Sequence, residues 1–520
     1  MAGTGILLYR FWTVENPSLL VCTLLFSLVL IFRFGRKGKS TADSPPPSPW
    51  RLPIIGNLHQ LSAPLYKGLH ALSLKHGPII RLQLGSIPYC AVSSGDLATQ
   101  VAKTHESLFS DRRITKGARI LFSEGDGVLI SPDNKCWRLA RKLCVNELLS
   151  LRKVQSIHFI RKEEVARLVS MIRSSSDQKI DLSDSFLKLA GSIVSRSVLG
   201  RKISSDEDER DNVEGKLALQ SAHAITDWFS FEDIIPSLSW LDHLTGLSRR
   251  LKNTSQAIHA FLDQVIDERE TAGIQSGNEG DDTKCFVDII LELLKKEMIS
   301  PDFTRGNFRA ILLDMFVAGI TTSAAAMEWA MTELARNPRI MKKVQEEVRG
   351  VVGSQSEIHE SDLDRMEYLK CVIKETLRLH GLTLIARQAS TTVTIGGFRL
   401  PAKVTALINI WAIHRDPAAW DKPLEFLPER FLNTCYNFKG QDQVYFPFGL
   451  GRRICPGVDF AMSEVEYALA NILWLFDWEL PDGMLAEDID MRATTSVIKL
   501  KKAPLCLVPV PVASPACQCT

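Results

Sequence analysis

Apolar positions along the chain recur mostly at helical spacing, and only a few short stretches alternate as strands do. Residues 79–84 and 89–92, separated by a segment containing Gly and Pro, predict one β-hairpin. Residues 392–395 and 398–400 predict a second hairpin around Gly396-Gly397. The pattern therefore predicts a mainly α fold with a smaller β region.

The longest apolar segment covers residues 302–335, contains no proline and is closed by Asn337-Pro338. This pattern predicts one helix of unusual length. Gly319 and Thr322 are weak helix formers in its middle. Because a threonine hydroxyl can bond a carbonyl one turn earlier and glycine permits a wider turn, we expect a groove here that could lie over a flat ligand. A small-residue face for close helix packing is the alternative.

Near the start of the chain, residues 16–32 are uncharged and mostly apolar, and Arg33, Arg36, Lys37 and Lys39 follow them. The run reaches the lower end of the roughly 17–25 residues that span a bilayer. A cleavable signal peptide and a buried core helix are the competing interpretations. The flanking cations favour a retained anchor with the rest of the chain in the cytosol.

These features divide the chain into segments. We expect a membrane anchor with a basic stop at 1–40, a stiff proline-rich hinge at 41–56, a globular domain at 57–510 and a tail at 511–520. The charge-rich stretches 204–211 and 275–284 are expected to be solvated loops.

Composition narrows the class of protein. The chain has 520 residues, 45% of them hydrophobic, and its 62 basic and 60 acidic residues give a net charge of +2. This balance excludes a disordered, collagenous or polytopic membrane protein and argues against nucleic acid as a partner. The 11 cysteines are too sparse for a disulfide framework, which favours a reducing compartment.

One short segment carries the clearest chemistry. Cys455 lies among glycines just ahead of an apolar helical run, where unpaired N–H groups favour a thiolate that can bind a soft metal. Arg453 could neutralise an anionic group of the same ligand. A buried structural cysteine in a glycine turn is the alternative.

This segment resembles the haem-binding loop of the cytochrome P-450 superfamily. Phe448, Gly451, Arg453, Cys455 and Gly457 match that loop in order and spacing. The resemblance implies the cytochrome P-450 fold, with haem b between the long central helix and the loop, and with Cys455 as the thiolate ligand of its iron. It makes 57–510 the catalytic domain of a microsomal, plant-type member.

Two further motifs agree with the resemblance. Trp137 and Arg141 resemble the W-x-x-x-R pair whose side chains reach a haem propionate. Glu375 and Arg378 resemble the E-x-x-R helix of the family, with Arg430 as the third member of a structural charge triad. If the triad is buried, loss of one member would strand a charge, which fits a scaffold that supports the haem loop.

The long helix contains the equivalent of the family's oxygen-binding signature, A-G-x-D/E-T. By resemblance, Gly319 opens the groove for O2, and Thr322 donates a hydrogen bond that helps to protonate the distal oxygen. Thr321 stands where the family usually has Asp or Glu. Proton delivery would then use water, Thr321 itself or another group. Gly381 also replaces a common proline.

The same arrangement implies a substrate pocket and a redox partner. Electrons would come from NADPH through a membrane-bound NADPH–cytochrome P-450 reductase that docks near Arg138, Lys142 and Arg452. The location implied is the endoplasmic reticulum membrane, with a single span and a cytosolic catalytic domain. The implied substrate is a hydrophobic terpenoid, alkaloid or phenolic metabolite. The expected pocket residues are Leu312, Met315, Phe316, Leu382, Thr383, Ile385, Ala386, Thr495 and Val497.

Two other functions stay open at this point. A haem-thiolate lyase or isomerase, or an oxidative cyclase or desaturase, would insert no net oxygen, and the missing acid at Thr321 keeps this class open. A membrane-tethered scaffold without enzymatic activity would use Cys455 only as a structural residue.

Overall fold

The structure is a computed structural model, and it describes residues 44–122, 125–201, 220, 230–275, 284–494 and 498–512. The expected anchor at 1–40 lies outside the described residues, as do the expected loop at 204–211 and almost all of the loop at 275–284. Only the first two residues of the expected tail, 511–520, are described.

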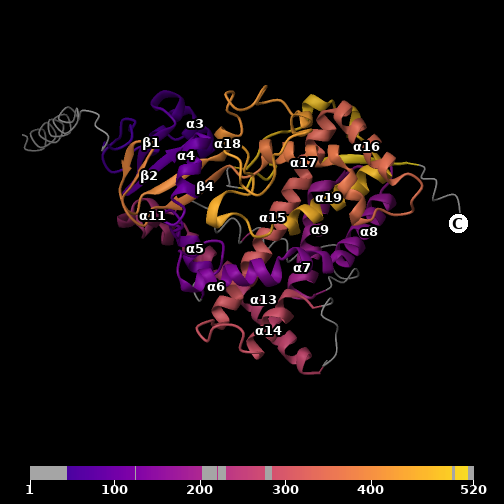
Figure 1. The fold of residues 1–520 in the computed structure, drawn as a ribbon, viewed down its shortest axis with the longest axis horizontal. Coiled ribbons are helices and arrows are strands. Elements are labelled where there is room, and N and C mark those ends of the chain that lie inside the picture. Colours follow the sequence, from indigo (N-terminus) through magenta and orange to yellow (C-terminus); the bar gives the residue numbers. More distant parts are fainter. Residues whose placement is uncertain are drawn as a thin grey trace, which may run out of the picture.

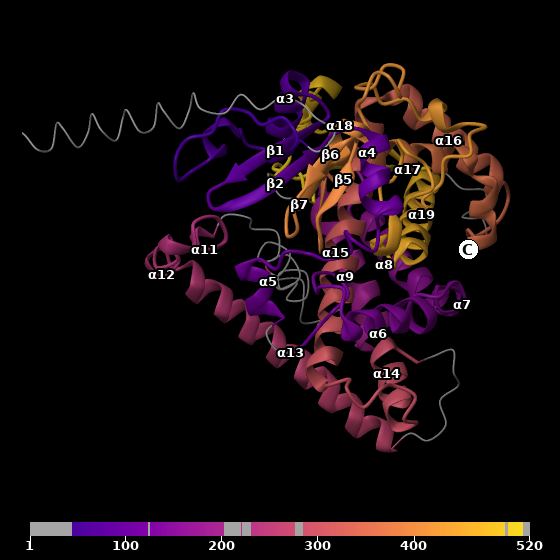
Figure 2. The ribbon, with the colours of Figure 1, turned by 60° about the vertical axis from the view of Figure 1, so that its left-hand side comes forward.

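A β-rich region and a larger helical region make up the molecule, and the long helix α15 lies where the two meet (Figures 1 and 2). The mainly α fold with a smaller β region is therefore confirmed. The helices are α3 (Leu65–His76), α4 (Gly95–Thr99), α5 (Lys116–Leu121), α6 (Lys135–Leu143), α7 (Leu151–Ser156), α8 (His158–Ser174), α9 (Leu182–Val194), α11 (Phe231–Ile234), α12 (Leu241–Leu244), α13 (Leu247–Gln275), α14 (Phe286–Lys295), α15 (Arg305–Arg336), α16 (Pro338–Val352), α17 (Glu367–His380), α18 (Ile410–Ile413) and α19 (Val458–Leu475). The strands are β1 (Ile79–Leu84), β2 (Ile87–Val92), β3 (Ile180–Asp181), β4 (Leu384–Gln388), β5 (Val393–Ile395), β6 (Phe398–Leu400), β7 (Thr405–Asn409), β8 (Phe476–Glu479) and β9 (Cys506–Pro511).

Both predicted hairpins are present. Strands β1 and β2 pair antiparallel, and β5 and β6 form a separate two-stranded sheet. The first turn is shorter than the sequence suggested because Leu84 already pairs with Ile87, and Gly85 takes the positive φ of 60° that this tight turn requires. The main sheet has the order β1-β2-β7-β4, in which only β2 and β7 run parallel.

The two faces of the main sheet bury different side chains, as the alternation of strand residues requires. Ile80 and Leu82 pack with residues of α3, whereas Ile79 and Cys90 pack with residues of α4. The sheet is thus covered on both faces, and β4 is held beside the helical region.

The long helix begins one turn later than the apolar pattern suggested, because Thr304 caps it. The Thr304 side chain accepts a hydrogen bond from the Asn307 amide at 3.2 Å, and the helix ends where Asn337 precedes Pro338. Helices α9, α17 and α19 pack against α15 in one continuous core. The apolar residues that predicted so long a helix are therefore explained by the burial of α15 on most of its sides.

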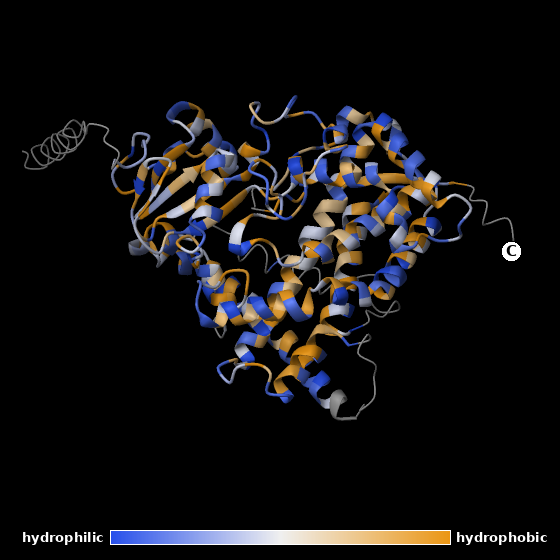
Figure 3. Cartoon of the chain, viewed as in Figure 1, coloured by the Kyte–Doolittle hydropathy of each residue, from blue (hydrophilic) through white to orange (hydrophobic). Residues whose placement is uncertain are grey.

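Within the described residues, α15 is the one helix that is long and apolar enough to cross a membrane. Other parts of the fold bury 72% of its most apolar window, which identifies a core helix. Apolar residues gather along α15 and the central strands in Figure 3, whereas hydrophilic residues are frequent on the outer helices.

The described part of the proline-rich hinge contacts the β region. The Ser44 carbonyl accepts a hydrogen bond from the Arg399 amide at 3.1 Å, and the Pro47 carbonyl accepts one from the Arg81 amide at 2.8 Å. Pro46 and Pro49 are buried. From Ser44 onward the segment is therefore attached to the edge of the domain.

A set of ionic contacts, which we call the clasp, joins α5 to α11 and α12. The ammonium of Lys116 lies 3.1 Å from the carboxylates of both Asp242 and Glu232. The Asp233 carboxylate accepts the Lys116 amide at 2.9 Å, and its carbonyl accepts Arg113 at 2.6 Å. Lys116, Asp233 and Asp242 are buried, whereas Glu232 and Arg113 at the ends of the clasp are partly exposed.

Candidate active site

The Cys455 loop is held in place by its own backbone. The Cys455 amide donates to the Phe448 carbonyl at 3.0 Å, and α19 begins three residues later. Gly451 has a φ of 70°, and a Cβ there would lie 1.6 Å from the Ala102 carbonyl oxygen. The loop can therefore pack this closely on the segment after α4 only with glycine at position 451.

Burial raises the pKa of the Cys455 thiol, whereas the Gly457 amide and the Arg141 guanidinium act in the opposite direction. The sequence suggested that the helix terminus favours the thiolate. In the folded chain that effect is smaller than desolvation, so a stable thiolate needs a further positive charge.

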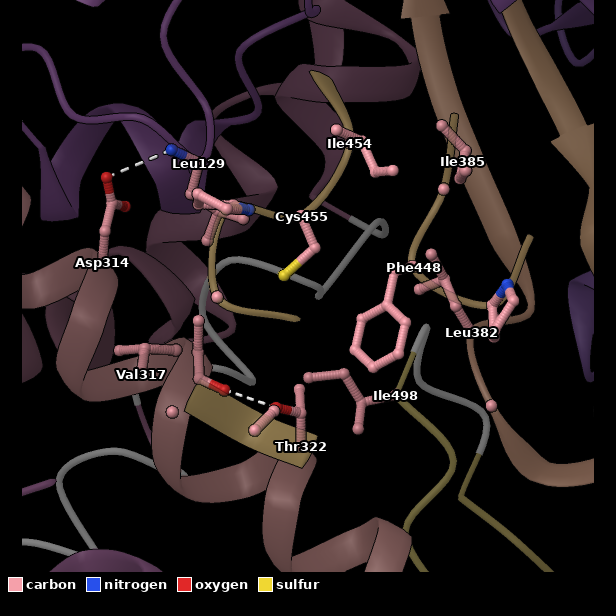
Figure 4. A pocket seen from close by; sticks show the side chains of 18 of the residues that line it. Leu129, Asp314, Val317, Thr322, Leu382, Ile385, Phe448, Ile454, Cys455 and Ile498 are labelled. Carbon is pink, nitrogen blue, oxygen red and sulfur yellow. Dashed lines mark hydrogen bonds between the residues drawn. The ribbon is translucent and has the colours of Figure 1, made fainter. Parts of the chain in front are cut away.

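Thr322, on α15, lies opposite Cys455. Its hydroxyl donates to the Ala318 carbonyl at 2.5 Å, the bond that the sequence suggested, and the helix stays continuous through Gly319. In Figure 4 the Cys455 sulfur points into the space between its loop and α15, with Thr322 and Val317 on the far side.

That space is a cavity of about 460 Å³ with mostly apolar walls. It extends from the Cys455 loop along α15 to Arg113, Thr115 and Ala118, beside the clasp. The sequence-predicted residues that line it are Arg141, Met315, Gly319, Thr322, Leu382, Ile385, Ala386, Phe448, Arg453, Cys455 and Gly457.

Other predicted residues are not brought to the cavity wall. The Thr321 hydroxyl is fully buried and donates to the Val317 carbonyl at 3.0 Å. Thr495 and Val497 lie outside the described residues, although Ile498, their neighbour, lines the cavity. Four more residues of this group are buried away from the wall, namely Leu312, Phe316, Thr383 and Trp137, and Gly451 is half-buried in the loop itself.

Trp137 supports an arginine rather than facing the cavity. Its indole N–H donates to the Val128 carbonyl at 3.0 Å, and the Arg453 guanidinium lies 4.2 Å from the ring centroid. Arg141 donates to the Ile454 carbonyl at 2.7 Å, next to the cysteine. The W-x-x-x-R pair therefore orients the basic side of the cavity.

Four guanidinium groups meet on that side, from Arg112, Arg141, Arg387 and Arg453. Burial lowers the pKa of Arg112 to about 10 and that of Arg453 to about 9. Burial also lowers the pKa of Arg387 far below its usual value, and the three neighbouring arginines add to the effect. Arg112 Nε and Arg453 Nη1 are buried, and neither has a hydrogen-bond partner among the residues that the structure describes. These donors and charges fit a ligand that carries carboxylates.

Asp314 on α15 lies beside this cluster. One carboxylate oxygen accepts the Leu129 amide at 3.1 Å and also the Val128 amide, and this bonding fixes the segment that crosses the cavity (Figure 4). Burial raises the pKa of Asp314 to about 7, against those two amides and Arg112. Its other oxygen is buried and has no partner in the described part of the chain.

The triad forms a buried network away from the cavity. Glu375 binds Arg378 through two bonds of 2.7 and 2.8 Å and binds Arg430 at 3.0 Å. Arg378 also donates to the carbonyls of His414 and Pro423. The network ties α17 to the chain that leads toward the Cys455 loop.

Sequence reasoning did not find Arg112, Arg387 or Asp314. Arg387 had a signal, because an arginine in a strand with apolar neighbours needs an anionic partner. Arg112 is one charge in the run Asp111-Arg112-Arg113. Asp314 is the single carboxylate in the apolar stretch between Ala310 and Ile320.

Comparison with known proteins agrees with this geometry. Residues 45–507 match the family described as Cytochrome P450. A phenylacetaldehyde oxime monooxygenase from Prunus mume is 42% identical over 504 residues, which cover 95% of this chain and 94% of that protein. A cytochrome P450 from Persea americana is 42% identical over 457 residues, covering 87% and 91% of the two chains. A strychnine-11-hydroxylase from Strychnos nux-vomica is 40% identical over 498 residues, covering 94% and 96%.

Proposed function

The chain belongs to the cytochrome P450 family of monooxygenases, and from this premise we propose that it oxidises a hydrophobic plant specialised metabolite of the terpenoid, alkaloid or phenolic class. One observation carries the proposal. Cys455 and Thr322 face each other across an apolar cavity, and at one side of it lie arginine donors that have no partner among the described residues.

The residues around the cavity fit the haem that the family implies. Cys455 would bind the iron, and Arg112, Arg141, Arg387 and Arg453 would pair with the two propionates. Haem bound through a thiolate supplies activation of O2, because the sulfur donates electron density that favours O–O cleavage. The positive iron would also provide the charge that the buried Cys455 thiolate requires.

The protein itself binds and orients the substrate and excludes water from the cavity. Val128, Leu129, Met315 and Ile385 present apolar surface that excludes water and accepts a hydrophobic substrate. The Thr322 hydroxyl is exposed to the cavity and can donate a hydrogen bond there once its bond to Ala318 opens. The names of two relatives, an oxime monooxygenase and a strychnine hydroxylase, support specialised metabolites as the substrate class.

We infer that electrons arrive from NADPH through a reductase on the surface behind Cys455. Arg138 and Arg452 both bind Asp133, at 2.6 and 3.1 Å, so their charges are partly neutralised. Lys142 is exposed in the same region. We place the protein in the endoplasmic reticulum membrane with a single N-terminal span, on the basis of the 16–32 segment and the cations after it.

A reaction without net oxygen insertion is the second candidate. The Thr321 position carries no acid, and its hydroxyl is turned away from the cavity. A lyase or isomerase would then rearrange an already oxidised substrate without reductase.

The test combines purified protein, the reductase, NADPH and a plant small-molecule extract, with products read by mass spectrometry. A gain of one oxygen that needs NADPH supports the monooxygenase, whereas turnover without NADPH supports the lyase or isomerase. Loss of two hydrogens without oxygen gain would indicate a desaturase or cyclase.

Cys455→Ser is the matched variant for this test. We expect it to lose the absorbance band of the reduced, carbon monoxide-bound haem-thiolate protein and all NADPH-dependent product. Cys435→Ser, at an exposed cysteine, is the control and should behave as the unmodified protein. Full activity in Cys455→Ser would contradict the proposed function.

A further inference from the structure

One end of the cavity carries polar side chains that the proposed function does not use. We call it the polar end, and the residues that line it are Trp329, His380, Gly381 and Lys499. The polar end continues into the apolar part of the cavity, because Lys499 directly follows Ile498, which lies near Thr322 in Figure 4. A ligand that fills the cavity would therefore contact both parts.

The Lys499 ammonium is buried there without an anion in contact. Only 7% of Lys499 is exposed. The ammonium donates to the Leu379 carbonyl at 3.0 Å, and it lies 3.5 Å from His380 Nδ1 and 5.6 Å from the centroid of the Trp329 ring. Among the described residues, no carboxylate makes an ion pair with it. Buried charges are usually paired, so an anion at this place would stabilise the ammonium.

The imidazole of His380 is held by other groups. Its Nε2 lies 2.6 Å from a carboxylate oxygen of Glu333, and its ring stacks on Trp329 with 4.1 Å between the centroids. Burial lowers the pKa of His380 well below its usual value, so the ring is neutral at pH 7. A neutral ring bonded through Nε2–H presents only the lone pair of Nδ1 to Lys499. The Glu333 carboxylate therefore contacts the ring and not the ammonium.

The charge of Lys499 is only marginally stable at neutral pH. Burial lowers the pKa of Lys499 to about 7, with smaller contributions from the charges of Arg415 and Lys67, whereas Glu333 acts in the opposite direction. Glu333 is also shared with other basic side chains, among them Arg336. A carboxylate in contact with the ammonium would raise this pKa and keep the charge in place.

Residues with little or no side chain leave room at the polar end. Gly381 stands where a proline is common, so no ring fills this position. A Cβ at Gly381 would lie 2.3 Å from the Leu377 carbonyl oxygen, so the turn needs a glycine here. Ala325 and Ala326, one turn before Trp329 on α15, also line the cavity.

We propose that the polar end binds the carboxylate of an acidic substrate through the Lys499 ammonium. This inference rests on the proposed function, because it narrows the substrate class of the same cavity to organic acids. The apolar remainder of the acid would lie along Ile498 toward Thr322, on the side that Cys455 faces. The oxidised carbon would then be remote from the carboxylate.

A structural role for Lys499 is the competing explanation. The Leu379 carbonyl belongs to the last turn of α17, where a cation stabilises the helix terminus. Such a role would support the fold without distinguishing a carboxylate from a neutral group. The experiment therefore compares ligands that differ in charge and hardly in size.

Calorimetric titration of the haem-loaded protein, without reductase or NADPH, measures binding alone. The probes are hydrocinnamic acid, geranic acid and abietic acid, each compared with its primary amide. At pH 7 we expect at least one acid to bind about tenfold more tightly than its amide, since a charge-assisted hydrogen bond contributes this factor or more. Acids that bind no better than their amides would overturn the proposal.

Lys499→Met removes the charge and keeps the length of the side chain. It should abolish the preference by weakening the acid, with the amide bound as before. Lys502→Met, at an exposed lysine of the same segment, is the matched control and should keep the preference. Equal weakening of acid and amide in Lys499→Met would identify a structural role and contradict the acid site.

The unmodified protein gives a second measurement, which stands even if Lys499→Met does not fold. At pH 8, above the pKa of Lys499, binding of the acid should take up roughly one proton, whereas the amide takes up none. Titration in two buffers of different ionisation enthalpy counts these protons. Acid binding without proton uptake would contradict contact with Lys499.

Products distinguish failure of this inference from failure of the proposed function. With reductase, NADPH and the plant extract, the oxygenated product should retain a carboxyl group, which methylation reveals as a mass shift. Oxygenated products formed only from neutral compounds would overturn the acid site and leave the monooxygenase intact. A preference for acids without any oxygenated product would contradict the monooxygenase and leave the binding site in place.

Discussion

Several charged residues around the cavity are buried, and removing their charges from water costs free energy. Burial lowers the pKa of Arg387 and of Arg453, and the nearby Arg112 lowers both further. Arg112 and Arg453 each keep a buried N–H without a hydrogen-bond partner among the described residues. Glu464 on α19 is a similar case in the core, since it is buried and neither carboxyl oxygen has a partner of normal geometry among the described residues. Groups of this kind are retained where a ligand or a reaction uses them.

The arginine cluster leads to a prediction about cofactor retention. Arg112→Gln should release haem more readily, because a charge-assisted hydrogen bond contributes about 1.5–3 kcal/mol, equivalent to roughly 10- to 100-fold in affinity. Transfer of haem to apomyoglobin measures the effect. Arg492→Gln, at an exposed arginine paired with Asp490, should release haem as the unmodified protein does. Equal release rates for the two variants would rule out a propionate contact by Arg112.

The buried Glu464 carboxyl on α19 leads to a prediction about stability. The folded pKa of about 8 lies above the unfolded value, so protonated Glu464 is compatible with the fold at low pH and costs stability as the pH rises from about 4.5 toward 8. By pH 7 this cost is about 3 kcal/mol. Glu464→Gln should therefore melt at a higher temperature than the unmodified protein at pH 8, and at nearly the same temperature at pH 4.5.

Among the elements, the long helix could be predicted from the sequence, whereas the buried state of the charge triad could not. Apolar periodicity and Asn337-Pro338 predicted α15 closely, because these signals are local. The i, i+3 pair Glu375 and Arg378 was visible in the sequence, but only packing against Arg430 makes it a buried network. Burial decides its energy, and periodicity alone does not report burial.

The triad predicts a large effect on stability. Glu375→Ala leaves the buried Arg378 and the partly buried Arg430 without their carboxylate and should destabilise the fold by roughly 3–5 kcal/mol. Chemical denaturation measures this change. Glu346→Ala removes an exposed pair with Lys342 and should cost less than about 1 kcal/mol. A small effect at Glu375 would mean that the network is dispensable for the fold.

At the scale of the whole molecule, the site combines segments that are far apart in the sequence. The motif around Cys455 could be found because its residues are neighbours in the chain. The sequence did not predict a role for Arg112, Asp314 and Arg387, because these residues meet only when α15, β4 and the segment before α5 pack together. The hydrophobic pattern of the sequence predicted the fold class, whereas the cavity wall depends on tertiary contacts between the elements.

The exposed surface behind Cys455 leads to a prediction about electron transfer. Lys142→Glu should slow reduction of the haem by the reductase several-fold, with haem content unchanged, because it reverses a charge that can guide docking. Stopped-flow reduction at low ionic strength measures it. Lys342→Glu makes the same charge change on α16 and should leave the rate unaltered. Equal rates in both variants would move the docking surface elsewhere.

The clasp has a consequence for how molecules reach the interior. Lys116, Asp233 and Asp242 lie next to the part of the cavity wall that Thr115 and Ala118 form, and all three are buried. A molecule that entered there would have to wait until these charges separate and become hydrated. The frequency of that opening would then limit admission through this side, so two compounds of equal fit would enter at the same rate.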